Sequence, residues 1–322
     1  MRVHPDEGNT LEPERTNRSL SHRILVLSNP QSRRYRARLV DTVIATIEAG
    51  GREAIRLETF ADVDRTVEAV EHLMQQYPSE ITDAVVIGGD GTLHLAVNAL
   101  VGHRVAIGYI PSGTGNDFSR GFFGKRYNDQ SDAKWIAQAL HGELVTIDLG
   151  QINQRYFVNV AGIGFDARVV QQLRGKKGWF PSVRYVGAAL RSLLFEKANT
   201  IELAGSSQKL LALSRRPCFM LNFANGPYFG NGMQIAPHAN FHDGSLAYCY
   251  IENAGFWKKL LAFKRLYQGR HIDFREVHCG QFHAVQVVTP GLPIEADGEW
   301  LGETPAFVRT LPAALSIRRA SA

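Results

Sequence analysis

The stretch Val85–Thr92, which reads VVIGGDGT, decides the fold of this chain. Its apolar residues predict the end of a buried strand, and residues 93–100 predict a helix directly after the turn. Glycines in the turn would allow positive φ and a close approach to a ligand. Backbone N–H groups and the helix dipole favour an anion at such a turn. The stretch therefore predicts a phosphate-binding turn, and Asp90 within it suggests either a bound Mg²⁺ or a hydrogen bond that holds the loop.

A second glycine turn, Pro111–Phe118, reads PSGTGNDF and follows a strand predicted over residues 105–110. We expect both turns at neighbouring strand ends of one sheet, where open α/β folds bind ligands. The hydroxyl groups of Thr92 and Thr114 are candidates for phosphate contacts. Either turn alone could be an ordinary tight connection, but the two together favour a nucleotide site.

Together the two turns resemble the catalytic domain of the diacylglycerol kinase and sphingosine kinase superfamily, in its bacterial lipid kinase branch. The first turn is shared with NAD kinases, and the second narrows the resemblance to lipid kinases. The resemblance runs from about Arg23 to the C-terminus. It implies two domains with the active site in the cleft between them.

The rest of the chain fits this plan. Strands and helices alternate over residues 22–143, which indicates a nucleotide-binding α/β domain with a mostly parallel sheet. Short strands dominate residues 144–310, one of them expected at 210–213, and indicate a mainly antiparallel β-sandwich for the lipid substrate. The resemblance implies that residues 311–322 return to the first domain. Residues 1–21 are polar and are expected to be a disordered extension.

Composition narrows the classes of partner. The net charge of +5 favours an anionic partner such as a nucleotide, a lipid or a nucleic acid. No nucleic acid is expected, because the chain carries no zinc-finger, RNP or helix-turn-helix signature. No apolar run approaches the roughly eighteen residues of a membrane span. Cys218, Cys249 and Cys279 are expected to be buried free thiols, which fits a cytoplasmic location.

A second carboxylate-bearing turn, Ile294–Glu299, reads IEADGE and follows a predicted strand. Alone, it could be a solvated surface turn. The resemblance implies that it faces the cleft, with Glu299 as the proton acceptor for the lipid hydroxyl and Asp297 as a supporting or metal-linked carboxylate. Asp90 is the rival candidate and could act through Mg²⁺. Walker A and protein-kinase motifs are absent, which leaves Gly88–Thr92 as the phosphate cradle.

ATP and Mg²⁺ are therefore the expected cofactors. In bacterial members of the family, the turn that matches Asn240–Leu246 holds a Mg²⁺, here implied at Asp243 and the carbonyls of Asn240 and Ser245. Asn29 belongs to an Asn-Pro turn that borders the nucleotide in the family. The predicted nucleotide-binding residues are Asn29, Thr59, Gly88, Gly89, Asp90, Gly91, Thr92, Gly113, Thr114, Asn116 and Asp117.

The segment Arg174–Phe180 is basic and aromatic, and it suits either a membrane interface or an ordinary exposed loop. The segment Phe256–Leu260 has a similar but weaker composition and is interpreted as an ordinary surface segment. His94 is expected to face solvent. The loop Asn225–Met233 resembles a glycine-rich loop of the family, and its sequence indicates no chemical role.

We therefore expect an ATP-dependent lipid kinase that phosphorylates a hydroxyl of a diacylglycerol-like lipid. It would be cytoplasmic, would contact the membrane surface peripherally, and could form a homodimer. One alternative is an NAD or other small-alcohol kinase of the same superfamily. The other is a nucleotide- or lipid-binding protein without turnover, which the presence of Asp90, Asp297 and Glu299 argues against.

Overall fold

The structure is a computed structural model that describes residues 22–173, 198–205 and 207–320. Strands and helices alternate in its first part. They are β1 (Arg23–Ser28), α1 (Ala37–Ala49), β2 (Glu53–Glu58), α2 (Val63–Gln76), β3 (Ile81–Gly88), α3 (Asp90–Leu100), β4 (Ala106–Pro111), α4 (Asp117–Phe122), η1 (Lys125–Asp129) and α5 (Asp132–His141).

Strands dominate the second part, as predicted. Its elements are β5 (Glu143–Ile152), β6 (Arg155–Phe157), β7 (Val160–Gly164), α6 (Phe165–Leu173), β8 (Asn199–Thr200), β9 (Leu203–Gly205), α8 (Gln208–Leu211), β10 (Pro217–Ala224), β11 (Leu246–Glu252), α9 (Phe256–Leu266), η2 (Arg270–Asp273), β12 (Val277–Phe282), β13 (Ala284–Val287), β14 (Pro293–Ala296), β15 (Glu299–Glu303) and β16 (Ala306–Arg319). The strand predicted at 210–213 is wrong. Leu210 and Leu213 are both buried three residues apart, which is the spacing of one helix face.

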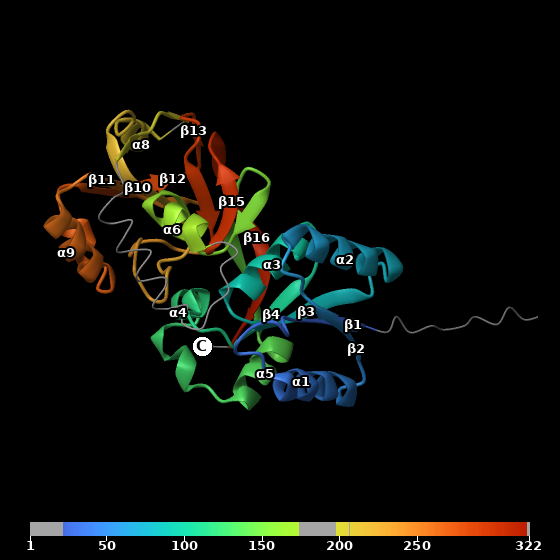
Figure 1. Cartoon of the computed structure of the whole chain (residues 1–322). Helices are drawn as coiled ribbons and strands as arrows, with labels where there is room; N and C mark the ends of the chain where they lie inside the picture. Colours follow the sequence, from blue (N-terminus) through green and yellow to red (C-terminus); the bar gives the residue numbers. More distant parts are fainter. Residues whose placement is uncertain (1–21, 174–197, 206, 321–322) are drawn as a thin grey trace, which may run out of the picture.

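The first sheet begins with four parallel strands in the order β2-β1-β3-β4 and continues through β16, β13 and β9. Apolar runs such as Leu25–Leu27 and Val85–Ile87 are buried, because helices cover both faces of this parallel region (Figure 1). The carboxyl ends of the four strands deliver Asn29, Thr59 and both glycine turns to one edge.

The second sheet is antiparallel, in the order β12-β11-β10-β7-β14-β15, with β8 beside β10. It packs against the β5, β13 and β16 region of the first sheet. The shared core contains Leu221, Phe223 and Ile294 from one sheet and Val285 and Val308 from the other. The predicted α/β domain and antiparallel sandwich are both confirmed.

The long strand β16 ties the two parts together. Near its start it pairs with β13, along most of its length it pairs with β5, and near its end Ile317 pairs in parallel with Ile107 of β4. The parallel region and the sandwich therefore share one continuous strand, which limits how far they can move apart.

Cysteine burial differs in part from the expectation. All three cysteines are free, but Cys279 is exposed on β12, a strand at the edge of the second sheet. Cys218 and Cys249 are buried as expected. Within the described ranges, no helix is long and apolar enough to cross a membrane.

Candidate active site

The two glycine turns touch each other through their backbones. A Cβ atom added to Gly113 would lie 2.4 Å from the Cα of Gly89, and one added to Gly88 would lie 2.4 Å from the Cβ of Thr92. Neither turn has a glycine with positive φ, so the expectation of positive φ is wrong. Gly89 and Gly113 instead allow the close contact between the turns, because a side chain at either would collide with the other turn, whereas Gly88 leaves room for Thr92 of its own turn.

Asp90 and Asn116 hold the second turn in place. The Asp90 carboxylate accepts hydrogen bonds from the N–H groups of Asp117 at 3.1 Å and Phe118 at 3.2 Å. Asn116 has a φ of 49°, and its side chain accepts from the N–H of Gly113 at 2.9 Å and donates to that residue's carbonyl. The loop-ordering role considered for Asp90 is therefore present in the structure.

Asp90 also has an unusual electrostatic environment. Burial raises the pKa of Asp90 from 3.8 to about 6, and the nearby charge of Asp117 adds to the shift. The two backbone N–H groups oppose it without cancelling it. A cation beside Asp90 would favour its ionised form, so this carboxylate suits a site that binds a metal-nucleotide complex.

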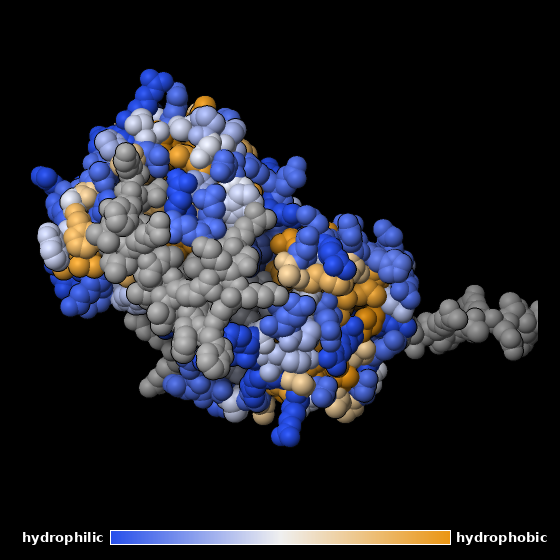
Figure 2. Space-filling model, in the orientation of Figure 1, coloured by the Kyte–Doolittle hydropathy of each residue, from blue (hydrophilic) through white to orange (hydrophobic). Residues whose placement is uncertain are grey.

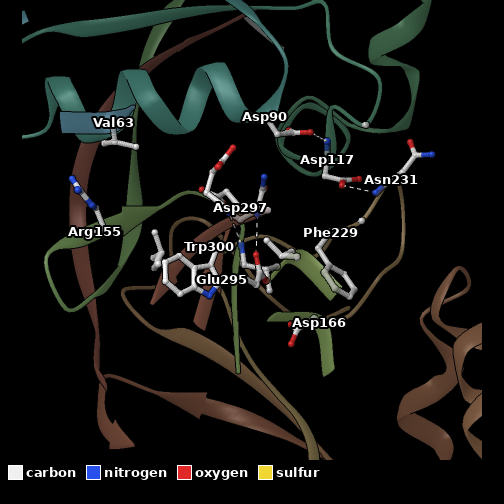
Figure 3. A pocket seen from close by; sticks show the side chains of 18 of the residues that line it. Val63, Asp90, Asp117, Arg155, Asp166, Phe229, Asn231, Glu295, Asp297 and Trp300 are labelled. Carbon is white, nitrogen blue, oxygen red and sulfur yellow. Dashed lines mark hydrogen bonds between the residues drawn. The ribbon is translucent and has the colours of Figure 1, made fainter. Parts of the chain in front are cut away.

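Asp117 connects the second turn to the loop Asn225–Met233, for which the sequence indicated no role. The Asp117 carboxylate accepts from the N–H groups of Asn231 at 2.8 Å and Gly232 at 2.7 Å. Gly230, Asn231 and Gly232 all have positive φ, which turns two successive N–H groups toward the carboxylate. Figure 3 shows this contact at the rim of the cleft.

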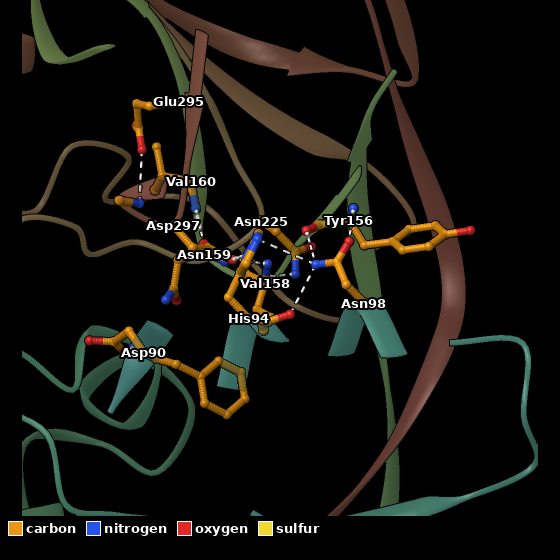
Figure 4. A network of polar contacts seen from close by, with 12 residues as sticks. Asp90, His94, Asn98, Tyr156, Val158, Asn159, Val160, Asn225, Glu295 and Asp297 are labelled. Carbon is orange, nitrogen blue, oxygen red and sulfur yellow. Dashed lines mark hydrogen bonds and ion pairs between the residues drawn. The ribbon is translucent and has the colours of Figure 1, made fainter. Parts of the chain in front are cut away.

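The Asp297 carboxylate binds the backbone at the start of the sandwich. Its carboxylate accepts from the N–H groups of Val158 at 2.9 Å, Asn159 at 2.9 Å and Val160 at 3.2 Å, and it lies 3.2 Å from Nδ1 of His94 (Figure 4). The Asp297 side chain is only 2% exposed. These contacts hold the Asp297 turn against residues 158–160, and the supporting role of Asp297 stays a prediction.

His94 is fully buried, so the expectation that it faces solvent is wrong. Its Nδ1 proton is assigned to the contact with Asp297, because an ionised carboxylate only accepts. One helical turn later, the Asn98 amide donates to the carbonyls of His94 and Tyr156 and accepts from the Tyr156 N–H. Helix α3 is thus fixed both to β6 and to the Asp297 turn.

Glu299 lies on the opposite wall of the cleft from the first glycine turn. A Cβ atom added to Gly91 would be 3.7 Å from Oε1 of Glu299. Glu299 is exposed as a residue, but partial burial of its carboxylate raises its pKa; His94 opposes this shift and the charge of Asp297 adds to it. The fold thus brings the predicted proton acceptor to the predicted phosphate cradle, although the two are far apart in the sequence.

The cleft between these walls has a volume of about 890 Å³ and is strongly acidic (Figure 3). Among the described residues, the charged side chains that line it are seven carboxylates and one cation, namely Asp62, Asp90, Asp117, Asp166, Glu295, Asp297, Glu299 and Arg155. The Asn159 Oδ1 atom is buried there without a hydrogen-bond partner among the described residues. This carboxylate excess would repel a bare triphosphate, so it fits a nucleotide that arrives with a divalent cation.

Two buried carboxylates in the cleft were missed by the sequence reasoning. Asp166 accepts hydrogen bonds from Asn222 and from the N–H of Ala167, and burial raises its pKa to about 6. Burial also raises the pKa of Glu295, whose carboxylate accepts from the N–H of Gly298. One feature of the sequence could have identified Glu295: it is a charged residue within the otherwise apolar strand β14, and charged residues are rarely buried unless they have a partner.

The remaining predicted nucleotide residues lie at the expected edge. Thr59 follows β2 and donates its N–H to the carbonyl of Ser28 at 2.9 Å. The hydroxyl oxygens of Thr59 and Ser28 are buried and have no hydrogen-bond partner in the described part of the chain. Thr92 is buried against Gly88, whereas Thr114 is exposed. The two hydroxyl oxygens are therefore unpaired polar atoms beneath the surface at the carboxyl ends of β1 and β2, and of the two threonines in the glycine turns only Thr114 is exposed.

The predicted metal turn is well ordered by its own side chains. Asp243 accepts from the Ser245 N–H at 3.0 Å and hydroxyl at 2.9 Å, and from Gln281 at 2.7 Å. Asp148, missed by the sequence reasoning, accepts from the N–H of residue 244 at 2.6 Å. No group of three His, Cys, Asp or Glu side chains suited to a metal occurs in the described ranges. A site made from one carboxylate and the carbonyls of Asn240 and Ser245 stays a prediction.

Comparison with known families agrees with this geometry. Residues 23–152 match the diacylglycerol kinase catalytic domain. Residues 159–319, half of the chain, match the YegS C-terminal NAD kinase beta sandwich-like domain. The chain belongs to the bacterial diacylglycerol kinase-like lipid kinase family. The resemblance carried by the two glycine turns is therefore confirmed.

Individual relatives extend over most of the chain. A diacylglycerol kinase of Mycobacterium tuberculosis is 29% identical over 306 residues, which cover 92% of this chain and 95% of that protein. The candidate lipid kinase YtlR of Bacillus subtilis is 30% identical over 263 residues, covering 76% and 82%. The crystal structure of a candidate diacylglycerol kinase from Bacillus anthracis has the same fold, with a TM-score of 0.69 at 21% identity over 92% of this chain and 97% of that one.

Proposed function

We propose that this kinase transfers the γ-phosphoryl group of ATP to a hydroxyl of a diacylglycerol-like lipid. The observation that carries the proposal is the position of Glu299, whose carboxylate faces Gly91 across the cleft. A phosphoryl transfer needs a phosphate site, a base for the acceptor hydroxyl, and alignment of the two. Gly91 belongs to the proposed phosphate site, and Glu299 is the proposed base.

The nucleotide would bind at the strand edge formed by the two glycine turns. The N-terminus of α3 offers N–H groups to an anion there, and the polar atoms of Thr59 and Ser28 lie at the same edge. Asp90 and Asp117 are the residues that would hold Mg²⁺. When bound, that ion would neutralise phosphate charge in the acidic cleft.

The reaction would proceed as follows. Glu299 accepts the hydroxyl proton of the lipid as the hydroxyl oxygen forms a bond to the γ-phosphorus. The bond between that phosphorus and the oxygen bridging it to the β-phosphorus breaks, and ADP leaves with the electron pair. Asp297 holds the turn that orients Glu299, because the Asp297 carboxylate accepts hydrogen bonds from the backbone N–H groups of residues 158–160. Glu299 then releases its proton to solvent.

The lipid acceptor is proposed from the names of the relatives and from the second glycine turn. We place the protein on the cytoplasmic side, in peripheral contact with the membrane, which agrees with three free cysteines. The segment Arg174–Phe180, interpreted as either a membrane contact or an ordinary exposed loop, lies outside the described residues.

The test is transfer of label from γ-radiolabelled ATP and Mg²⁺ to separate acceptors: diacylglycerol, monoacylglycerol, ceramide, sphingosine, undecaprenol and NAD. We expect label in diacylglycerol or a close analogue. Label in NAD alone would replace the lipid assignment with an NAD kinase. Bound ATP without transfer to any acceptor would contradict the proposed activity.

A further inference from the structure

Helix α9 has an unusual surface. Its inner face packs Phe256, Phe263 and Leu266 into the core formed with Phe165 and Phe219. A surface helix normally presents polar residues on its other face. Here the outward residues are again mostly apolar, and their exposed fractions are 79% for Trp257, 36% for Leu260, 45% for Leu261 and 54% for Tyr267.

These four side chains form one stripe, which we call the α9 stripe. Trp257, Leu260 and Leu261 are spaced three and four residues apart and so lie on one helix face, and Tyr267 follows at the end. The large apolar residues that are strongly exposed in the described ranges number seven, and four of them belong to this stripe. Single exposed apolar residues are common, but a gathered set marks an interaction surface.

Positive charge surrounds the α9 stripe. Residues 256–276 contain six cations, Lys258, Lys259, Lys264, Arg265, Arg270 and Arg275, and two carboxylates, Asp273 and Glu276. Both carboxylates are already in ion pairs, Glu276 with Lys258 and Arg275, and Asp273 with Arg270. Lys264 is exposed on the face of the stripe itself. Apolar side chains framed by a net positive charge complement an anionic lipid surface.

The position of α9 suits such a contact. Figure 1 shows the helix at the outer edge of the sandwich, on the side away from α1 and α2, and Figure 2 shows apolar side chains bordered by hydrophilic ones at the same edge. The helix shares its core with Phe165 and Val169 of α6. The neighbouring residues Asp166 and Val170 of α6 line the cleft. Helix α6 therefore belongs both to the core beneath α9 and to the lining of the cleft.

We propose that the α9 stripe docks the kinase on a membrane that contains anionic lipids. Trp257 and Tyr267 would lie at headgroup depth, Leu260 and Leu261 at the boundary with the acyl chains, and Lys264 against lipid phosphates. The purpose of the contact rests on the proposed function, since a lipid kinase must meet its acceptor at a bilayer. The docking itself is independent of turnover and can be measured separately.

The test compares the full-length protein with the double variant Trp257→Ser/Leu261→Ser. Both residues are exposed, so the fold should be retained. The matched control is Leu144→Ser/Phe307→Ser, which removes two exposed apolar side chains elsewhere (57% and 47% exposed). Binding is measured by co-sedimentation with vesicles of 70% phosphatidylcholine and 30% phosphatidylglycerol, and with vesicles of phosphatidylcholine alone.

We expect the parent and the control to bind the anionic vesicles equally within about twofold, and more tightly than neutral ones. The Trp257→Ser/Leu261→Ser variant should bind at least about tenfold more weakly. Lys264→Glu should weaken binding to the anionic vesicles and leave binding to neutral vesicles unchanged, because the contribution of a surface cation near anionic lipid is electrostatic.

Three results would overturn the docking site. They are a parent that does not bind anionic vesicles, a double variant that binds like the parent, and a parent dimer that the double variant converts to monomer in sedimentation velocity. A dimer that the double variant converts to monomer would assign the stripe to a second copy of the chain.

Transfer of phosphate to a short-chain diacylglycerol dissolved as monomers separates the docking proposal from the kinase proposal. The double variant should retain it, whereas failure of the parent would count against the kinase activity and leave the binding result intact.

Discussion

Asp297 and Glu299 belong to one turn but face different environments. Asp297 has a φ of 51°, which directs its carboxylate inward to the backbone of residues 158–160 and to His94. Glu299 comes after Gly298 and points into the cleft. The Asp297 carboxylate holds the turn in one conformation, and this conformation orients the Glu299 carboxylate toward the cleft.

The first prediction concerns Asp297. Replacement by Asn keeps the left-handed conformation accessible, but an NH₂ group then faces N–H donors. We expect Asp297→Asn to lower the free energy of unfolding by about 1–3 kcal/mol, the cost of leaving buried donors unsatisfied. Urea unfolding measures the change. The exposed Glu303→Gln, on β15, should change it by less than about 0.5 kcal/mol. Equal stability of the two variants would mean that Asp297 does not hold the turn.

The second prediction concerns the pH dependence caused by Asp90. Its pKa is about 6 in the folded protein and 3.8 ordinarily, so the folded state holds this proton more tightly. The tighter proton binding adds to the free energy of unfolding below about pH 4, and this contribution is lost as the pH rises through about 6. Asp90→Asn stays neutral throughout. At about 1.4 kcal/mol per pH unit, its stability relative to the parent should rise by up to about 3 kcal/mol between pH 4 and pH 7.5.

Urea unfolding of the parent and of Asp90→Asn across that pH range provides the measurement. Comparison of the two proteins at each pH cancels the titration of Asp166 and Glu295, which are buried elsewhere in the cleft. A difference in stability that stays constant from pH 4 to pH 7.5 would show that Asp90 titrates as an ordinary carboxylate.

The elements that hold the site were predictable where the signal is local. The apolar run before Gly88 predicted the end of β3, and residues 93–100 predicted most of α3, but α3 begins three residues earlier, so Asp90–Thr92 form its first turn instead of a loop. The reason for the glycines was not predictable, because it depends on contact between Gly89 and Gly113 across two strands. The same holds for the pairing of Asp117 with the loop around Asn231, since nothing in either segment identifies the other.

The third prediction tests that contact between turns. Gly113→Ala places a methyl group against the backbone at Gly89, where no flexible side chain can yield. We expect a loss of about 1–3 kcal/mol in the free energy of unfolding, as for other overpacked sites. Gly91→Ala is the control, because its methyl group would meet Glu299 at an ordinary 3.7 Å and α3 would gain a better helix former.

Guanidinium chloride unfolding of these two glycine variants measures both effects. We expect Gly113→Ala also to lose nucleotide affinity, whereas Gly91→Ala should keep the stability of the parent within about 1 kcal/mol. If Gly113→Ala were as stable as Gly91→Ala, the two turns would not be in contact in the folded protein.

In the whole molecule, the cleft lies between two parts that are joined by several contacts among the described residues. Strand β16 runs through both, His94 meets Asp297, and Asp117 meets the loop around Asn231. Motifs identified the family and the general position of the site because each glycine turn is continuous in sequence. The acidic character of the cleft was not predictable, since Asp166 and Glu295 reach it only through the packing of the sandwich.

We propose that Glu299, supplied by the sandwich, is the base for a phosphate site supplied by the α/β domain. Transfer of label from γ-radiolabelled ATP to short-chain diacylglycerol by Glu299→Gln tests this claim most directly, with Glu303→Gln as the control and nucleotide affinity measured in parallel. Under this assignment we expect unchanged nucleotide affinity and a transfer rate at least about a hundredfold lower, the usual contribution of a general base. Transfer by Glu299→Gln at the rate of the parent would contradict it.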